Sequence, residues 1–298
     1  WEMMEYLLIK PKDNVQDTVY LKINVINKKI KDFGDNNPQL MSRLRWLNSN
    51  IGSEKDIIIK PFKKIEVSDN KLRILGREIE INNFGFPKKI SSYFSQEMTY
   101  IKDDPENILS DKLNFEVINK NGVIEKFSNI SFNLSKDKQT YANWKSENLS
   151  KNFKLDVNGL IEYDGMLDYN IQLIAKNDID IKDISLNILF NKNAAKYILG
   201  LGNKGGLLKN DIDWKWNINN HQEGVWLGNV NKGLQYVLRD NNYERPLNTN
   251  FYRSKPLNLP YSWYNDSKGG ISIKINNEIV KVNNYSGERS IIKGDTLN

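Results

Sequence analysis

Apolar and polar residues alternate along much of this chain, and a period of two is the pattern of β-strands that bury one face. Asn, Asp and Gly residues, which favour turns, bound most of the alternating runs. The clearest runs are TVYLKINVI (18–26), KLRILGREIEI (71–81), KLNFEVI (112–118), NFKLDV (152–157), YNIQLIAK (169–176), ISLNILF (184–190), LQYVLRD (234–240), GISIKI (270–275) and EIVKV (278–282).

This alternation favours antiparallel sheets, because strands of parallel sheets are buried on both faces and read as continuous apolar runs. Many short strands separated by turns are typical of a β-sandwich. Only residues 37–47 and 193–199 could hold a helical turn. The sequence therefore predicts an all-β protein with little helix, built as an antiparallel β-sandwich that is either one large sandwich or two packed ones.

Two turns and one domain boundary can be placed on this pattern. Asn158-Gly159 tolerates positive φ and predicts a hairpin, and INNE at 275–278 predicts another. The stretch 133–152 has few apolar residues and separates two strand-rich blocks. We therefore expect blocks at 1–140 and 141–298, although the two could equally be halves of one sandwich. Both ends of the chain look cut, as in an excerpt of a longer protein.

Composition narrows the function. The 298 residues carry 43 basic and 37 acidic side chains without a Lys/Arg block, so nucleic acid is a poor candidate partner. No run reaches the roughly 18 apolar residues of a membrane span. With no Cys and a single histidine, His221, thiolate and multi-His metal sites are excluded. We expect no metal site and no cofactor.

Aromatic residues gather in one polar, glycine-punctuated region. Four of the seven tryptophans lie between residues 214 and 263. Sugars stack their C–H faces on aromatic rings and bond their hydroxyls to polar neighbours, so this mixture favours carbohydrate binding over simple core filling. The candidate carbohydrate-binding residues are Trp214, Trp216, Trp226, His221, Glu223, Arg245, Tyr252 and Trp263.

Other motifs carry weaker signals. Asp211, Asp213, Glu223 and Glu244 are the acids embedded in the aromatic region, but solvated surface acids are commoner than a glycosidase pair. LGLGNKGG (199–206) lacks the ending of a phosphate loop, so we interpret it as a tight loop where two backbones approach.

Longer strings resemble a known family. SRLRWLNSNIG (42–52), DGMLDYNIQL (164–173), GVWLGNVNKGLQYVLRD (224–240) and YERPLNTNFY (243–252) are similar to the non-catalytic N-terminal region of bacterial glycoside hydrolases like family 123. The resemblance covers nearly the whole chain from about residue 20. It implies a β-sandwich region preceding a (β/α)8 catalytic barrel, which we expect after residue 298.

The resemblance also implies an activity for the parent enzyme, which would be secreted, periplasmic or on the cell surface. The family cleaves β-linked N-acetylgalactosamine from glycans by a substrate-assisted route that uses an adjacent Asp-Glu pair. No Asp-Glu dipeptide occurs in these residues, so no catalytic residue can be carried over. Glycan and the barrel of the same polypeptide are the expected partners.

Three functions follow from these observations. The first is an accessory region that packs on the barrel and lends aromatic side chains to its substrate cleft. The second is an independent carbohydrate-binding module in which Trp214 and Trp216 form the platform. The third is a self-contained sugar epimerase or polysaccharide lyase that uses His221 with Glu223 or Arg245 for proton transfer.

Overall fold

The computed structural model describes residues 2–9, 17–34, 37, 39, 56–217, 224–244 and 258–298. The chain divides into two compact units, residues 1–55 and 56–298. In the first unit, strands β1 (Glu2–Ile9) and β2 (Asp17–Asn24) form an antiparallel hairpin, followed by a 3-10 turn, η1 (Lys31–Gly34). Most of the hairpin's side chains are exposed.

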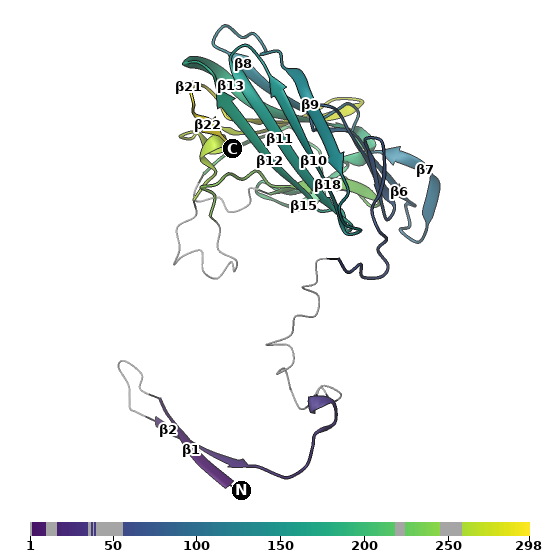
Figure 1. The fold of residues 1–298 in the computed structure, drawn as a ribbon, viewed down its shortest axis with the longest axis vertical. Coiled ribbons are helices and arrows are strands. Elements are labelled where there is room, and N and C mark those ends of the chain that lie inside the picture. Colours follow the sequence, from purple (N-terminus) through teal and green to yellow (C-terminus); the bar gives the residue numbers. More distant parts are fainter. Residues whose placement is uncertain are drawn as a thin grey trace. The chain divides into compact units, whose positions relative to one another are not determined.

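The second unit holds four antiparallel sheets among its described residues (Figure 1). The first, the β5 sheet, has the order β3-β4-β5-β6-β7 and is formed by residues close in sequence. Its strands are β3 (Glu66–Ser68), β4 (Lys71–Ile74), β5 (Arg77–Ile81), β6 (Pro87–Phe94) and β7 (Ile101–Asn107). The second, the β11 sheet, has the order β22-β12-β11-β10-β9. Its strands are β9 (Ser128–Ser135), β10 (Tyr141–Leu149), β11 (Phe153–Glu162), β12 (Leu167–Ala175) and β22 (Thr296–Leu297).

The third, the β13 sheet, has the order β16-β19-β20-β13-β21, with β8 also paired to β13. Its strands are β8 (Asn114–Asn119), β13 (Ile179–Asn191), β16 (Ile212–Lys215), β19 (Gly270–Ile275), β20 (Ile279–Tyr285) and β21 (Arg289–Ile291). The fourth, the β14 sheet, has the order β15-β14-β17-β18. Its strands are β14 (Tyr197–Gly200), β15 (Asn203–Leu207), β17 (Val225–Asn229) and β18 (Lys232–Tyr236). Short helical turns are η3 (Lys192–Ala194) and α2 (Tyr261–Tyr264).

Strand β11 shows how the sequence pattern builds the core. Its alternate residues from Phe153 to Ile161 are buried, while the residues between them are partly exposed. Successive strand residues point to opposite faces, so the apolar set turns inward as one row. The buried residues of the four sheets join in one continuous hydrophobic cluster. The β11, β13, β14 and β5 sheets therefore share a core.

The turn predicted at 275–278 is confirmed, and the one at Asn158-Gly159 is wrong. The Asn276 side chain accepts hydrogen bonds from the N–H groups of Glu278 (2.9 Å) and Ile279 (2.7 Å), which closes the β19–β20 hairpin. Gly159 instead lies inside β11, opposite Trp144. A Cβ at residue 159 would come within 2.2 Å of the Trp144 indole, so the glycine serves packing rather than a turn.

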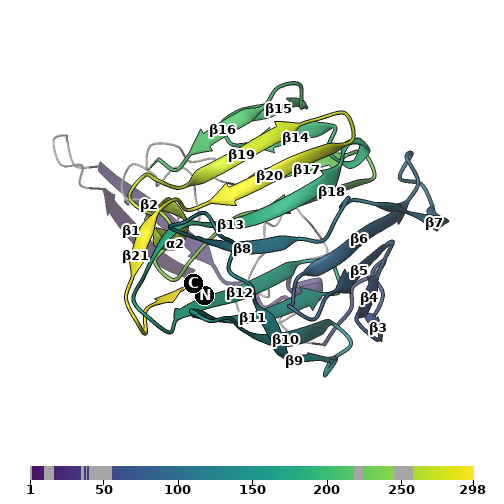
Figure 2. The same cartoon turned by 90° about the horizontal axis from the view of Figure 1, so that it is seen from above.

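The prediction of an all-β, antiparallel protein with little helix is confirmed. The four sheets have a propeller-like arrangement, seen from above in Figure 2. The predicted boundary at 140 falls between β9 and β10, which pair with each other in one sheet. The compact division of the chain lies at residues 55 and 56 instead. Of the two segments predicted to hold a helical turn, 37–47 lies outside the described residues apart from 37 and 39. The other, 193–199, begins in the 3-10 turn η3 and reaches strand β14 at residue 197.

Candidate functional site

Trp214 and Trp216 lie in the core. Trp214 is in β16 and Trp216 follows that strand, and their side chains are 7% and 2% exposed. Their rings meet edge to face with centroids 4.9 Å apart. Trp214 is paired with Ile271, which is also buried, so it belongs to the inner face of the β13 sheet. Neither indole presents a ring face on which a sugar could stack.

Trp226 differs, because it lies on the outer face of the β14 sheet and is only half-buried. Its six-membered ring covers Gly228, where a Cβ would come within 2.2 Å of the ring. Leu199, opposite Trp226 on β14, is 51% exposed, and Leu207 on β15 is 49% exposed. Tyr197, between Leu207 and Gly228 in the register, completes this surface. We call these four side chains (Tyr197, Leu199, Leu207 and Trp226) the Trp226 face.

Trp263 is the fourth predicted tryptophan, and it lines a cavity of about 950 Å³ in the second unit. It lies in α2 and is 8% exposed. The other predicted residues, His221, Glu223, Arg245 and Tyr252, lie outside the described residues. The epimerase or lyase hypothesis depends on His221 and stays a prediction.

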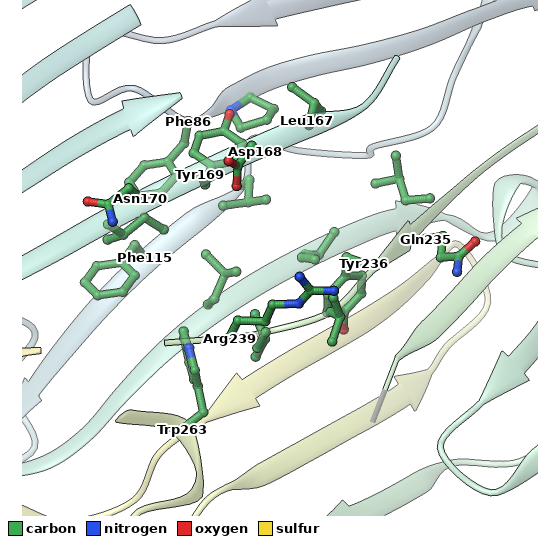
Figure 3. A pocket seen from close by; sticks show the side chains of 18 of the residues that line it. Phe86, Phe115, Leu167, Asp168, Tyr169, Asn170, Gln235, Tyr236, Arg239 and Trp263 are labelled. Atoms are coloured by element: carbon green, nitrogen blue, oxygen red, sulfur yellow. The ribbon is translucent and has the colours of Figure 1, made fainter. Parts of the chain in front are cut away.

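One wall of the cavity is aromatic. The Tyr169 ring on β12 is stacked with Phe86 at a centroid distance of 6.3 Å, and Phe86 is stacked with Phe115 at 6.1 Å. Trp144 supports Tyr169 from the core with an edge contact at 5.5 Å. Figure 3 shows Phe86, Tyr169 and Phe115 gathered on one side of the open space. Strand β12 contributes this wall because its inward residues at 167, 169 and 171 are only half-buried, unlike those of β11.

The opposite wall combines an aromatic group with a cation. Tyr236, Arg239 and Trp263 lie across the cavity from the aromatic wall (Figure 3). The Tyr236 hydroxyl donates a hydrogen bond to Asn284 Oδ1 at 2.9 Å. Burial raises the pKa of the Tyr236 phenol well above its ordinary value, so the group stays a neutral donor. The Arg239 guanidinium lies 5.5 Å from the Tyr243 ring centroid.

Two further polar groups at the cavity have spare hydrogen-bonding capacity. Arg77 donates to the Asp164 carbonyl oxygen at 3.0 Å, while its Nε is buried with no hydrogen-bond partner among the described residues. Burial lowers the pKa of Arg77, since taking a cation out of water disfavours its charge. The Tyr169 hydroxyl is also buried without a partner there, and burial raises its pKa. Buried polar groups left unpaired in a protein call for an explanation, and a ligand is one.

Among the described residues, two acids line the cavity, Asp168 and Asp240, and Asp168 is exposed. Asp240, which lines the cavity, accepts hydrogen bonds from the backbone N–H groups of Asn242, Tyr243 and Ser262, all at 2.9 Å. Asp211 and Asp213 both face Lys274 at 3.5 Å on the surface. Within the described residues, no group of three His, Cys, Asp or Glu side chains is placed to hold a metal ion.

The sequence reasoning missed most of this cavity, whose lining comes from elements scattered between residues 74 and 298. One signal was present: Tyr169 and Tyr236 occupy inward positions of alternating strands, where aliphatic residues are usual, and each brings a polar tip. The LGLGNKGG interpretation did locate a close approach, because a Cβ on Gly200 would lie 2.0 Å from the Gly224 carbonyl oxygen.

Comparison with known families identifies the chain. Residues 65–298 match the model of the third domain of glycoside hydrolase 123. This match spans most of the chain, which therefore belongs to that family. A search of curated proteins found no match. None of the described helices is long and apolar enough to cross a membrane.

Proposed function

We propose that this chain is a non-catalytic part of a secreted, periplasmic or cell-surface bacterial glycoside hydrolase. The parent enzyme would act on N-acetylhexosamine-containing glycans, and this region would hold part of the glycan in the 950 Å³ cavity. The cavity carries the proposal, because an aromatic wall lies opposite a hydroxyl and a guanidinium across it. The chain also belongs to a glycoside hydrolase family.

The chemistry of the cavity suits a sugar. The half-buried ring of Tyr169, stacked against the buried Phe86, offers flat apolar surface to a pyranose C–H face. Tyr236, Arg239 and Gln235 supply donors and acceptors along the other wall. A volume within the usual range of about 300–1,000 Å³ for ligand sites leaves room for more than one sugar ring.

The acids that line the cavity fit binding of the glycan rather than its cleavage. A glycosidase of the usual kind flanks the scissile bond with two free carboxyl groups. Two of the described acids line the cavity, and one of them, Asp240, is already engaged by three backbone N–H groups, so Asp168 alone does not make such a pair. Binding remote from the reacting bond can still raise the rate of the parent enzyme, because that energy is available to position the substrate.

The test is a calorimetric titration of chain 1–298 with oligosaccharides that contain β-linked N-acetylgalactosamine. Arg239→Gln and Tyr236→Phe should each weaken binding by roughly tenfold, the loss expected for one charged or partly buried hydrogen bond. Arg73→Gln is the matched control, since Arg73 lies on β4 and is paired with Glu78 at 2.8 Å. Equal affinity of the unmodified chain and the three variants, or no binding by the unmodified chain, would contradict the proposal.

A second role, docking onto another domain of the same polypeptide such as the catalytic barrel, is favoured by the Trp226 face. Leu199 and Leu207 expose about half of their surface beside a half-buried indole, and such patches often mark interaction sites. Hydrogen exchange of β14 and β17 should be slower in the longer polypeptide than in chain 1–298. Unchanged exchange would remove this role.

We also propose that the β11 and β13 sheets are the two layers of a β-sandwich. Support comes from the cavity, which residues of β12 and residues Ile184, Leu186 and Ile188 of β13 line together. A solution scattering profile fitted better by separated blades than by stacked layers would argue against it.

A further inference from the structure

The outer face of the β13 sheet carries two polar rows that cross five strands. Directly opposed residues on neighbouring strands point to the same face, so the pairing register defines each row. The first row runs Asn114, Asn187, Asn283, Ser272, Asp213, and the second runs Glu116, Ser185, Tyr285, Gly270, Lys215. We call these ten residues the polar strip. Figure 2 shows β16, β19, β20, β13 and β8, the strands that these rows cross, running side by side.

Hydrogen bonds within the strip fix its polar groups. Glu116 accepts one from Asn114 Nδ2 at 2.7 Å and another from Asn187 Nδ2 at 3.2 Å. At the other end, a hydrogen bond from Ser272 and the charge of Lys274 lower the pKa of Asp213. A row of amides and carboxylates held in place in advance loses little conformational freedom when a ligand binds.

Two acceptors at the centre of the strip are unsatisfied. Asn187 Oδ1 and Asn283 Oδ1, on directly opposed residues, are buried and have no hydrogen-bond partner among the described residues. Asn187 is only 3% exposed although it belongs to the outer face. An acceptor removed from water without a partner destabilises the protein, so a ligand that brings hydroxyl or amide donors here would recover lost hydrogen bonds.

The strip carries little net charge. Its two acids, Glu116 and Asp213, are accompanied by one cation of the strip, Lys215, and Lys274 beside the strip lies 3.5 Å from both Asp213 and Asp211. An anionic polymer would need an excess of cations, and a basic peptide would need an excess of acids. The Tyr285 phenol lies over Gly270, where a Cβ would come within 2.7 Å of the phenol oxygen, and Lys215 Nζ lies 4.7 Å from the Tyr285 ring centroid.

We propose that the polar strip binds a neutral glycan chain that lies across the strands. Four spacings of about 4.8 Å make the strip roughly 19 Å long, enough for several sugar rings in a row. The ligand class rests on the proposed function, but the surface is separate from the cavity. Hydroxyl and acetamido N–H groups of the glycan donate to Asn187 and Asn283, while Glu116 and Asp213 accept from its outer hydroxyls.

The test uses chain 1–298 and a trisaccharide of β-linked N-acetylhexosamine, measured by calorimetry. Asn283→Ala and Glu116→Gln should each weaken binding by roughly five- to twentyfold, as loss of one or two hydrogen bonds implies. Asn158→Ala is the matched control, because Asn158 is a half-buried asparagine on β11 of another sheet. Thermal unfolding of each variant verifies that it is folded.

Combining these variants with Arg239→Gln separates the two sites. Loss of binding in the strip variants alone supports the strip and contradicts the cavity as the glycan site. Loss in Arg239→Gln alone overturns the strip and leaves the proposed function standing. Wild-type affinity for the trisaccharide in both strip variants also overturns the strip. So does a strip that binds a protein partner and no glycan.

Discussion

Two tryptophans among the described residues lie over a glycine of a β-strand, but one is buried and the other is half-buried. Trp144 covers Gly159 from the neighbouring strand and is 1% exposed, with its Nε1 donating to the Gly85 carbonyl oxygen at 2.8 Å. Trp226 covers Gly228 of its own strand and remains half-buried on an outer face.

The comparison shows that placing an indole over a glycine does not by itself decide whether the indole is buried. In both places a missing Cβ lets an indole lie against the backbone, at the same 2.2 Å from the point where a Cβ would stand. The first indole faces the β5 sheet and helps to close the core, whereas the second faces away from it. One arrangement therefore serves stability, and the other supplies the surface that we propose for docking.

Truncating the two indoles should give the largest difference. Trp144→Ala removes a large buried ring and a buried hydrogen bond, so we expect a loss of about 3–5 kcal/mol in the free energy of unfolding. Trp226→Ala should cost about 1 kcal/mol, because the ring is already partly in water. Urea unfolding measures both, and similar losses would break the comparison.

Adding a methyl group beneath the buried indole should have the next largest effect. Gly159→Ala forces a Cβ into the Trp144 ring, which cannot move within a packed core, and we expect a loss of about 3 kcal/mol. The lowered midpoint of chemical unfolding would report it. A variant as stable as the parent would show that Trp144 has room to shift.

Replacing indole by phenyl tests the role of the Nε1 donor. Trp144→Phe should cost about 2 kcal/mol, since the Gly85 carbonyl loses its donor and a small cavity remains. Trp216 is equally buried, but its Nε1 has no partner among the described residues. Trp216→Phe should therefore cost about 1 kcal/mol or less, because it also removes an unsatisfied donor. A larger loss at Trp216 than at Trp144, seen by thermal unfolding, would contradict this account.

The smallest effect is expected at the exposed pair. Gly228→Ala also creates a clash, but the Trp226 ring can swing outward, so the loss should be about 1 kcal/mol or less. The emission of Trp226 should shift to longer wavelength as it enters water, with the Trp226→Phe spectrum as the reference. An unchanged spectrum with a large loss of stability would mean that the ring is held in place.

Sequence reasoning succeeded wherever local chemistry decides structure. The alternation in 270–275 and 278–282 predicted β19 and β20, and the Asn276 side chain closes the turn between them. The same reasoning failed at Asn158-Gly159, because the residue that requires the glycine, Trp144, is fifteen positions away in the chain. It also could not place Trp214 and Trp216 in the core. Either face of a strand can be buried or exposed to solvent until the sheets pack.

By itself, the sequence determined that this protein is all-β and antiparallel, and its longer strings indicated the glycoside hydrolase family. Period-two alternation suffices for the first, because the direction of a side chain from a strand is set by the backbone. Only the tertiary structure decided which face of each sheet is inside, where the cavity opens, and that the residues of the polar strip form continuous rows. These depend on pairing between strands far apart in sequence, such as β13 with β8 and β13 with β20, and such contacts form through the fold rather than through neighbouring residues.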